Sequence, residues 1–511
     1  MKTKRLAALL LTLVFALALI PMSTFAAQRA VAADSTASIK VENAVKDDVL
    51  AAYKLINITY NSTTNTLAYE WSSAAIKDYF ENGTTNGTGI VYDVKKFAEL
   101  SDNTETNQTA LKELLAGLPK YIFDNTIVAV KTETVDADGN ATFADLAMGE
   151  YFIRPTSTTS VYQLMLQKVE PTVVDGTYVI DDVTFTAKHQ EVSVVKTADK
   201  TSVTKNEKVT YTITVDIPTY ATQAVDKSFY VSDLLPDGLT IDTDSIKVVK
   251  NGTDITDKAG TQYTLNKEAN TTTEPYYTFK LSVDTDNYTD NWSDDGGKQL
   301  VITYTATLNN DNTTAVNVKE TNTVTFDYSN YPYVEHSHKQ KTATRDVTTF
   351  AIKIDKYVNG DEDAKLAGAK FDLYRTATQA EIDASLAYTI PHTAVKGIKL
   401  EWDLVTDDDG VATFEKYEAN GTNYDYYLVE TQAPSGYNPL DDAVKVNFTD
   451  SDVATTAGIY TVKVPNSSGI TLPITGGTGT VIFTVVGIAL MVGAVILLVV
   501  SRKKSKANDN K

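Results

Sequence analysis

Three segments of this 511-residue chain alternate between apolar and polar residues over most of their length, and this alternation constrains the fold more than any other feature. They are residues 209–215, 300–308 and 321–328. Because successive side chains of a strand point to opposite faces, each segment can bury one face and leave the other in solvent. Turn-forming clusters separate such segments at short intervals, which favours β-sandwiches. The 29 tyrosines, against 16 phenylalanines, agree with an all-β protein.

Shifts in this pattern, together with the length of the chain, predict three β-rich domains. The first, residues 34–190, mixes strands with helical insertions, whereas the domains at 191–345 and 346–470 are built from strands. In the first domain we expect strands near 37–44, 53–60, 127–135 and 150–154, and helices over 73–81 and 92–121. The polar residues 336–340 are expected to form the linker before the third domain.

Both ends of the chain carry apolar segments that indicate targeting. Residues 1–27 combine a basic start, an apolar stretch and small residues, which is typical of a secretory signal peptide; cleavage could fall as late as residue 32. Residues 481–500 contain no charge and are long enough to cross a bilayer as a helix. The basic tail at 501–511 should then stay in the cytoplasm, because positive residues resist translocation.

A short motif precedes this second apolar segment. It reads Leu472-Pro473-Ile474-Thr475-Gly476, and the order of motif, apolar span and basic tail resembles the cell-wall sorting signal of Gram-positive surface proteins. The resemblance implies that a membrane-bound sortase cuts between Thr475 and Gly476, holds Thr475 as a thioester and passes it to an amine. The protein would then be secreted and covalently anchored to the peptidoglycan of the cell wall.

The charge and residue content exclude several classes of function. The chain has 46 Lys and Arg against 66 Asp and Glu, so its formal net charge is 46 − 66 = −20. Loss of residues 1–27 and of everything after Thr475 leaves 38 − 65 = −27. A chain this acidic lacks the basic surface that nucleic-acid binding requires. The absence of cysteine excludes disulfides, cysteine-ligated metals and thiol nucleophiles.

We expect neither a cofactor nor a metal. The chain has four histidines, and His336 and His338 alone offer too few ligands for a metal site. The acidic run at 407–410 is more typical of a hairpin turn than of a calcium loop. No phosphate-binding loop or catalytic triad stands out, so we expect a protein that is not an enzyme.

Phrases within the body of the chain carry a second resemblance. Residues 366–374 (LAGAKFDLY) and 429–437 (VETQAPSGY) resemble the Ig-like B-type repeat of Gram-positive surface proteins and the pilin E-box. Residues 231–239 (VSDLLPDGL) resemble an isopeptide-forming fimbrial domain. With the two ends, the chain resembles a sortase-assembled backbone pilin. The resemblance implies three tandem Ig-like β-sandwich domains.

The resemblance also implies covalent crosslinks, because in this family a Lys and an Asn of the sandwich core join as an isopeptide bond with the help of an acid. Burial favours a neutral amine, which is nucleophilic, and a protonated carboxyl group, which can shuttle protons. Strand alternation tests which residues point into the core. In the second domain Lys196, Asp233 and Asn322 each share a face with the apolar residues of their strands.

In the third domain the acid is Glu430 and the asparagine is Asn466, since both are in phase with apolar neighbours. The lysine has two candidates. Lys356 is in phase with the apolar residues at 350, 352 and 354, whereas Lys353 fits the Lys-x-Asp start that the family often shows. Alternation favours Lys356. The first domain offers no comparable set, and we expect no bond there.

A backbone pilin also needs an amine that accepts the threonine of its neighbour. The family places this lysine in a Tyr-Pro-Lys setting at the end of the first domain, where this chain has Thr186-Ala187-Lys188. Lys188 is therefore the predicted acceptor, although the two residues before it differ from the family pattern. Phe185, in an edge strand beside it, is expected to dock against the next subunit.

These features predict a structural protein, the shaft subunit of a covalently polymerised, cell-wall-anchored pilus (fimbria) that supports adhesion. Its expected partners are further copies of itself, pilus-specific and housekeeping sortases, peptidoglycan, a tip subunit and a host receptor. The alternative is a wall-anchored adhesin or accessory pilus subunit that binds a host ligand or sugar. That alternative shares the sorting signal but needs no acceptor lysine.

Overall fold

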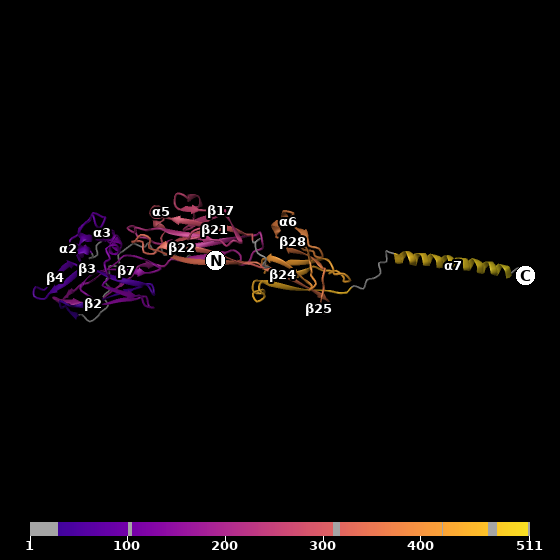
Figure 1. Ribbon diagram of the computed structural model, residues 1–511, viewed down its shortest axis with the longest axis horizontal. Helices are drawn as coiled ribbons and strands as arrows, with labels where there is room; N and C mark the ends of the chain where they lie inside the picture. The colour runs from indigo at the N-terminus through magenta and orange to yellow at the C-terminus, as the bar shows by residue number, and fades with distance from the viewer. Residues whose placement is uncertain (1–28, 101–104, 310–316, 422, 469–477, 509–511) are drawn as a thin grey trace, which may run out of the picture. The chain divides into compact units, whose positions relative to one another are not determined.

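The structure is a computed structural model that describes residues 29–100, 105–309, 317–421, 423–468 and 478–508 (Figure 1). Its contacts divide the chain into two units. The first holds the described residues up to Lys200, from Asn206 to 309, and from Glu320 to Val347. The second holds Thr201–Lys205, 317–319 and the described residues from Thr348 onward. Strands predominate in both, in agreement with the expected all-β class. The division into three domains remains a prediction.

The first unit opens with strands whose burial alternates as their sequence does. These are β1 (Arg29–Ala30), β2 (Thr36–Glu42), β3 (Val49–Asn61), β4 (Thr66–Trp71), β5 (Lys131–Thr134), β6 (Ala141–Ala147), β7 (Gly149–Ser157), β8 (Val161–Tyr162), β9 (Met165–Val169), β10 (Thr172–Val174), β11 (Thr177–Ile180), β12 (Val183–Thr186) and β13 (His189–Gln190). One sheet has the order β12-β2-β6, and another has the order β4-β3-β7-β9 with β5 also paired to β3. In β2, Ala37, Ile39 and Val41 are buried on one face.

The expected strands of this region are present, although the run 127–135 contributes only the four residues of β5. The edge position of β12 agrees with its expected place in a sheet. The expectation that Phe185 docks against a neighbour is wrong. Phe185 lies opposite Val41 in the parallel ladder of β12 and β2, and it is only 3% exposed because it packs in the core of its own unit.

Helices fill the expected insertions. They are α1 (Ala74–Glu81), α2 (Val94–Leu100), α3 (Glu105–Ala116) and α4 (Leu118–Asp124). Ser73 caps α1 by accepting a hydrogen bond from the Ile76 N–H, which explains where that helix begins. The single stretch predicted over 92–121 is divided, because Gly117 ends α3 and Pro119 stands in the first turn of α4. Proline has no N–H with which to continue the preceding helix.

Two five-stranded sheets follow in the first unit. Their strands are β14 (Val194–Ala198), β15 (Lys208–Asp216), β16 (Phe229–Leu234), β17 (Leu239–Lys250), β18 (Thr253–Asp254), β19 (Thr264–Asn266), β20 (Phe279–Val283), β21 (Gln299–Leu308), β22 (Lys319–Ser329) and β23 (His338–Thr348). Short helices η1 (Thr256–Lys258), α5 (Thr285–Asn291) and η2 (Ser293–Asp295) join some of them. The sheets have the orders β14-β15-β21-β17-β18 and β19-β20-β16-β22-β23. The three alternating segments of the sequence lie in β15, β21 and β22, and each buries every second residue.

The residues before β23 do not behave as the predicted linker. His338 already pairs as the first residue of β23, and the preceding Tyr331 and Tyr333 are buried. Asn330 Nδ2 donates a hydrogen bond of 2.9 Å to the carbonyl of Thr158. Buried tyrosines and this hydrogen bond fix the segment to the earlier sheets of the same unit, so the polar sequence at 336–340 is not a flexible connection.

The second unit contains a further pair of sheets. Its strands are β24 (Phe350–Val358), β25 (Asp361–Lys365), β26 (Lys370–Thr376), β27 (Tyr388–Thr389), β28 (Lys396–Val405), β29 (Val411–Tyr417), β30 (Tyr426–Gln432), β31 (Val444–Val446) and β32 (Ile459–Asn466), with one short helix α6 (Gln379–Asp383). One sheet has the order β25-β24-β29, with β32 paired parallel to β24, and the other has the order β27-β28-β26-β30-β31. The core between them includes Ile352, Phe371, Phe414 and Leu428.

Candidate functional site

Three polar side chains meet in the core of the second unit: Lys356 of β24, Glu430 of β30 and Asn466 of β32. None is more than 5% exposed. The Lys356 amine donates a hydrogen bond to Asn466 Oδ1 and lies 3.1 Å from Glu430 Oε1. Asn466 Nδ2 in turn donates to both carboxylate oxygens of Glu430 at 3.1 Å. Each of the three predicted residues therefore contacts the other two.

The strand pairing explains why these side chains converge. β24 and β32 run parallel, with Lys356 opposite Val464 and Val358 opposite Asn466. Lys356 continues the series of core-facing residues that includes Ile352 and Ile354. The amine is thus carried into the apolar layer at the point where Asn466 ends β32.

The other lysine candidate lies elsewhere. Lys353 is opposite Thr413 on one side of β24 and opposite Thr461 on the other, and its side chain is partly exposed. The structure places Lys356, not Lys353, beside Glu430. Alternation had favoured the same residue.

Burial controls the chemistry of the Lys356 amine. Removal from water lowers the pKa of Lys356, and the nearby charge and hydrogen bond of Glu430 oppose that shift. The Lys356 amine lies over the ring of Phe371, 5.5 Å from the ring centroid. A lowered pKa increases the fraction of neutral amine, which is the nucleophilic form.

The backbone of Lys356 is held by Gly410, in the turn before β29. The Lys356 N–H donates a hydrogen bond of 2.8 Å to the Gly410 carbonyl. Gly410 has φ +72°, and a Cβ there would lie 2.3 Å from the Lys356 carbonyl oxygen. Asp407 closes the turn by accepting hydrogen bonds from the N–H groups of Asp409 and Val411. The acidic run at 407–410 is thus a turn, although it joins β28 of one sheet to β29 of the other and does not form a hairpin.

A second polar cluster lies between the two five-stranded sheets of the first unit. The Lys196 amine, on β14, forms an ion pair and hydrogen bond with Asp233 Oδ2, on β16, and neither side chain is exposed. Asn322, on β22, is also fully buried. Among the described residues no hydrogen bond joins Asn322 directly to Lys196 or Asp233. The connection runs instead through Tyr304.

Tyr304 of β21 is the residue that the sequence reasoning missed. Its hydroxyl accepts hydrogen bonds from Lys196 at 3.0 Å and from Asn322 Nδ2 at 2.6 Å, and it donates to Asp233 Oδ1 at 3.0 Å. Tyr304 belongs to the alternating run 300–308, so its position in the core was predictable. A tyrosine in a core needs a partner for its hydroxyl, and that requirement is the signal that pointed to a polar cluster.

The electrostatics of this cluster favour uncharged partners. Burial lowers the pKa of Lys196 and raises the pKa of Asp233, while the attraction between the two opposes both shifts. The amine also lies 5.1 Å from the ring of Tyr211 and 5.3 Å from the ring of Tyr304. A dry, aromatic surrounding of this kind favours a neutral amine beside a protonated acid.

Lys188 lies between β12 and β13, outside both clusters. Its side chain is partly exposed, in contrast to the buried Lys196 and Lys356. Its carbonyl accepts a hydrogen bond of 2.9 Å from the Gln163 N–H, which fixes the backbone. Burial lowers the pKa of the nearby Lys112, and the charge of Lys188 lowers it further, so the two amines are neighbours.

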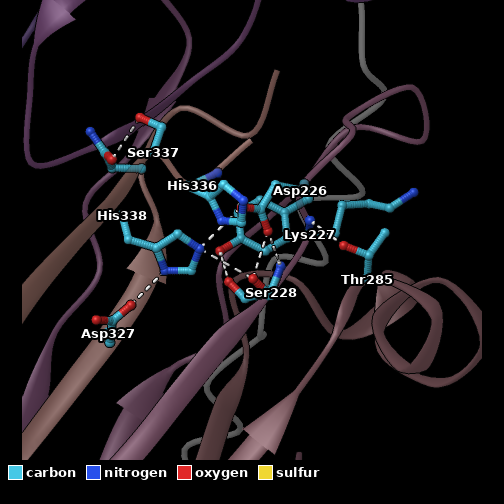
Figure 2. Close-up of polar contacts among 10 residues, drawn as sticks. Asp226, Lys227, Ser228, Thr285, Asp327, His336, Ser337 and His338 are labelled. Atoms are coloured by element: carbon cyan, nitrogen blue, oxygen red, sulfur yellow. Dashed lines mark hydrogen bonds and ion pairs between the residues drawn. The ribbon is translucent and has the colours of Figure 1, made fainter. Parts of the chain in front are cut away.

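His338 of the first unit lies in a separate network, shown in Figure 2. His338 Nε2 lies 3.1 Å from Asp226 Oδ2, and its Nδ1 lies 2.5 Å from Asp327 Oδ1. Burial by itself lowers the pKa of His338, but the two aspartates raise it to about 9. The network borders a depression of about 420 Å³ whose lining includes His336 and Glu335. In the described part of the chain, no group of three or more metal-type side chains is arranged to hold an ion.

The two ends differ in what the structure describes. The predicted signal peptide at 1–27 and the motif Leu472–Gly476 lie outside the described residues. The helix α7 (Thr478–Asn508) includes a stretch, Thr484–Arg502, that is long and apolar enough to cross a membrane. It covers most of the span expected at 481–500.

Comparisons with known proteins connect these features. Residues 350–463 match a family described as a prealbumin-like fold domain, and residues 464–506 match the LPXTG cell wall anchor motif. The chain is 26% identical to fimbrial subunit type 2 of Actinomyces naeslundii, over 77% of this chain and 76% of that protein. It is 29% identical to fimbrial subunit type 1 of Actinomyces viscosus, over 28% of this chain and 30% of that protein.

A solved structure extends the likeness to the fold. The chain is similar in structure to the T6 backbone pilin of Streptococcus pyogenes, which has a modular three-domain structure. The match has a TM-score of 0.53 and 19% sequence identity, and it covers 81% of this chain and 80% of the T6 pilin. The domain match, the anchor motif and the fimbrial relatives together support a sortase-assembled major pilin. The fimbrial relatives and the anchor match support a structural pilus subunit held at the bacterial surface by its cell-wall anchor. The apolar helix α7 fits the membrane segment of that anchor.

Proposed function

We propose that this pilin is polymerised head to tail by sortase and strengthened by an isopeptide bond in each polar cluster. Sortase would cleave between Thr475 and Gly476 and transfer Thr475 to the Lys188 amine of the next copy. Such a contact is heterologous and does not close on itself, so repetition produces a filament. A housekeeping sortase would finally attach the last subunit to peptidoglycan.

The observation that carries the proposal is the meeting of Lys356, Glu430 and Asn466 in one dry core. The neutral Lys356 amine would attack Asn466 Cγ, forming the Nζ–Cγ bond, and the Cγ–Nδ2 bond would break. Glu430 contacts both nitrogens, so it can take the proton that Nζ loses and deliver one to the departing Nδ2. Ammonia leaves, and no other reactant is needed. The pilin would act only once on itself and is not an enzyme in the usual sense.

Lys196 and Asn322 would form the equivalent bond in the first unit, with Asp233 as the acid. The two bonds would give an exported shaft without cysteine the covalent strength that disulfides give other secreted proteins. Lys188, by contrast, must react with another molecule, and its partial exposure suits that role.

The polymer is tested by boiling cell-wall extracts in detergent. We expect a ladder of multimers from the native chain and a single wall-linked species from Lys188→Ala. Lys112→Ala is the matched control, because Lys112 is a neighbouring amine and its loss should leave the ladder intact. A ladder that persists in Lys188→Ala would contradict the acceptor assignment. Absence of a ladder from the native chain would favour the adhesin alternative.

A further inference from the structure

The two polar clusters differ in how the acid reaches the asparagine. In the second unit Glu430 contacts Asn466 Nδ2 directly at 3.1 Å. In the first unit the acid is Asp233, whose side chain is one methylene shorter. Among the described residues Asn322 meets the acid only through a hydroxyl, because its Nδ2 lies 2.6 Å from the oxygen of Tyr304 and that hydroxyl donates to Asp233.

The Tyr304 hydroxyl uses its full hydrogen-bonding capacity inside this cluster. A phenol has one donor and two acceptor positions. Here the donor is directed at Asp233, and the acceptors receive the Lys196 amine and the Asn322 amide. The tyrosine thus touches the nucleophile, the acid and the leaving nitrogen at once. Its ring is fixed by stacking on Tyr211, with centroids 5.5 Å apart, and by edge contact with Phe279 at 5.2 Å.

We propose that Tyr304 is a catalytic residue for the Lys196–Asn322 bond, relaying the proton between Asp233 and the Asn322 nitrogen. The inference rests on the proposed function, since it presumes that this bond forms. It assigns to the first unit a four-residue mechanism where the second unit uses three.

The relay balances in atoms and protons. Lys196 Nζ attacks Asn322 Cγ as the neutral amine. The Tyr304 hydroxyl gives its proton to Nδ2 as the Cγ–Nδ2 bond breaks, and the protonated Asp233 supplies a proton to the tyrosine oxygen. The ionised Asp233 then takes the proton that Nζ loses. Ammonia leaves, and Asp233 and Tyr304 end in the protonation states in which they began. Burial and the charge of Asp233 raise the pKa of Tyr304, so between these transfers it remains a hydroxyl that can both donate and accept.

The test follows bond formation in the full chain, made in a host without sortase and purified in mild detergent. Intact mass and peptide mapping report each bond as the loss of one ammonia, sampled at intervals after a pulse of synthesis. We expect Tyr304→Phe to slow the Lys196–Asn322 bond at least about tenfold, since a positioned proton donor contributes roughly 10² to 10⁴ in rate. The Lys356–Asn466 bond of the same molecules is the internal reference and should keep its rate.

Tyr211→Phe is the matched control. Tyr211 stacks on Tyr304 and its hydroxyl also approaches Asn322, but among the described residues no hydrogen bond joins that hydroxyl to Asp233, so it cannot relay the acid's proton. This variant should bond at the native rate. Formation of the bond at the native rate in Tyr304→Phe would overturn the relay while leaving the bond itself established. A native chain that never links Lys196 to Asn322 would instead overturn the proposed function.

A second variant separates catalysis from packing. Asp233→Glu in the Tyr304→Phe background supplies an acid of the length that reaches the asparagine directly in the second unit. Recovery of bonding in this double variant supports the relay, because a lost packing contact would not be restored by a longer acid. A double variant that retains native circular dichroism and stays unbonded would contradict it.

Discussion

Lys356 and Asn466 lie on the adjacent parallel strands β24 and β32, and their side chains are hydrogen-bonded. In chain order, β24 is the first strand and β32 the last strand of the two sheets of the second unit. The two residues are 110 positions apart in the chain. A covalent bond between them would close nearly all of that fold into one loop. A pulling force on the filament would then pass through this bond, and the strands between β24 and β32 would not bear it.

The first prediction concerns this pair. In Lys356→Ala the intact mass should fall short of the variant's own sequence mass by one ammonia less than the native mass falls short of the native sequence mass. By the loop-closure argument used for disulfides, losing a link across about 100 residues costs on the order of 5 kcal/mol in the free energy of unfolding. Thermal unfolding should therefore occur well below the native temperature.

Lys353→Ala is its control, because Lys353 stands on the same strand and faces away from Glu430. Lys353→Ala should keep the native ammonia shortfall, relative to its own sequence mass, and nearly the native stability. The opposite result, with the bond lost in Lys353→Ala and kept in Lys356→Ala, would reverse the assignment.

Alternation carried most of the prediction from sequence. It placed Lys196, Asp233 and Asn322 on buried faces because a strand's side chains have a period of two, which tertiary packing does not change. The same argument preferred Lys356 over Lys353. Pairing between distant strands is what brought these residues together, and a single sequence does not contain it.

The misses have physical causes of a different kind. Tyr304 was not among the predicted site residues, because nothing in an alternating run says which partner a buried hydroxyl will find. Phe185 was expected to face a neighbour, since an edge strand does not reveal which of its faces packs against the core. The residues at 336–340 looked like a linker because they are polar, whereas the buried Tyr331 and Tyr333 anchor the segment just before them.

The second prediction concerns the glycine that supports Lys356. In Gly410→Ala the new Cβ would lie 2.3 Å from the Lys356 carbonyl oxygen, so β24 or the turn must shift. We expect the Lys356–Asn466 bond to form several-fold more slowly, measured by intact mass at intervals after synthesis. The Lys196–Asn322 bond should be unaffected, since it lies in the other unit.

Gly368→Ala separates crowding from backbone strain. Gly368 also has a left-handed backbone, with φ +79°, but a Cβ there would meet nothing within 4 Å. Its substitution should cost only the strain of about 1–2 kcal/mol that a side chain pays in this conformation. Equal slowing of the bond in the two variants would show that contact with Lys356 is not the cause.

The third prediction concerns pH and the network of Figure 2. His338 has an ordinary pKa near 6.5 in the unfolded chain, and Asp226 and Asp327 raise its folded pKa to about 9 against the effect of burial. A raised folded pKa contributes stability that is fully present below pH 6.5 and is lost as pH rises through 9. A difference of this size corresponds to roughly 3 kcal/mol.

Two measurements check it. The ring signal of His338 in NMR spectra should titrate near pH 9, assigned by its disappearance in His338→Gln. Urea unfolding of the first unit, in the uncrosslinked Lys196→Ala background, should show stability falling between pH 6.5 and 9, and His338→Gln should flatten that slope. His336→Gln is the matched control, because His336 is exposed and should leave the slope unchanged. A His338 titration near pH 6.5 would mean that neither aspartate stabilises the charged ring.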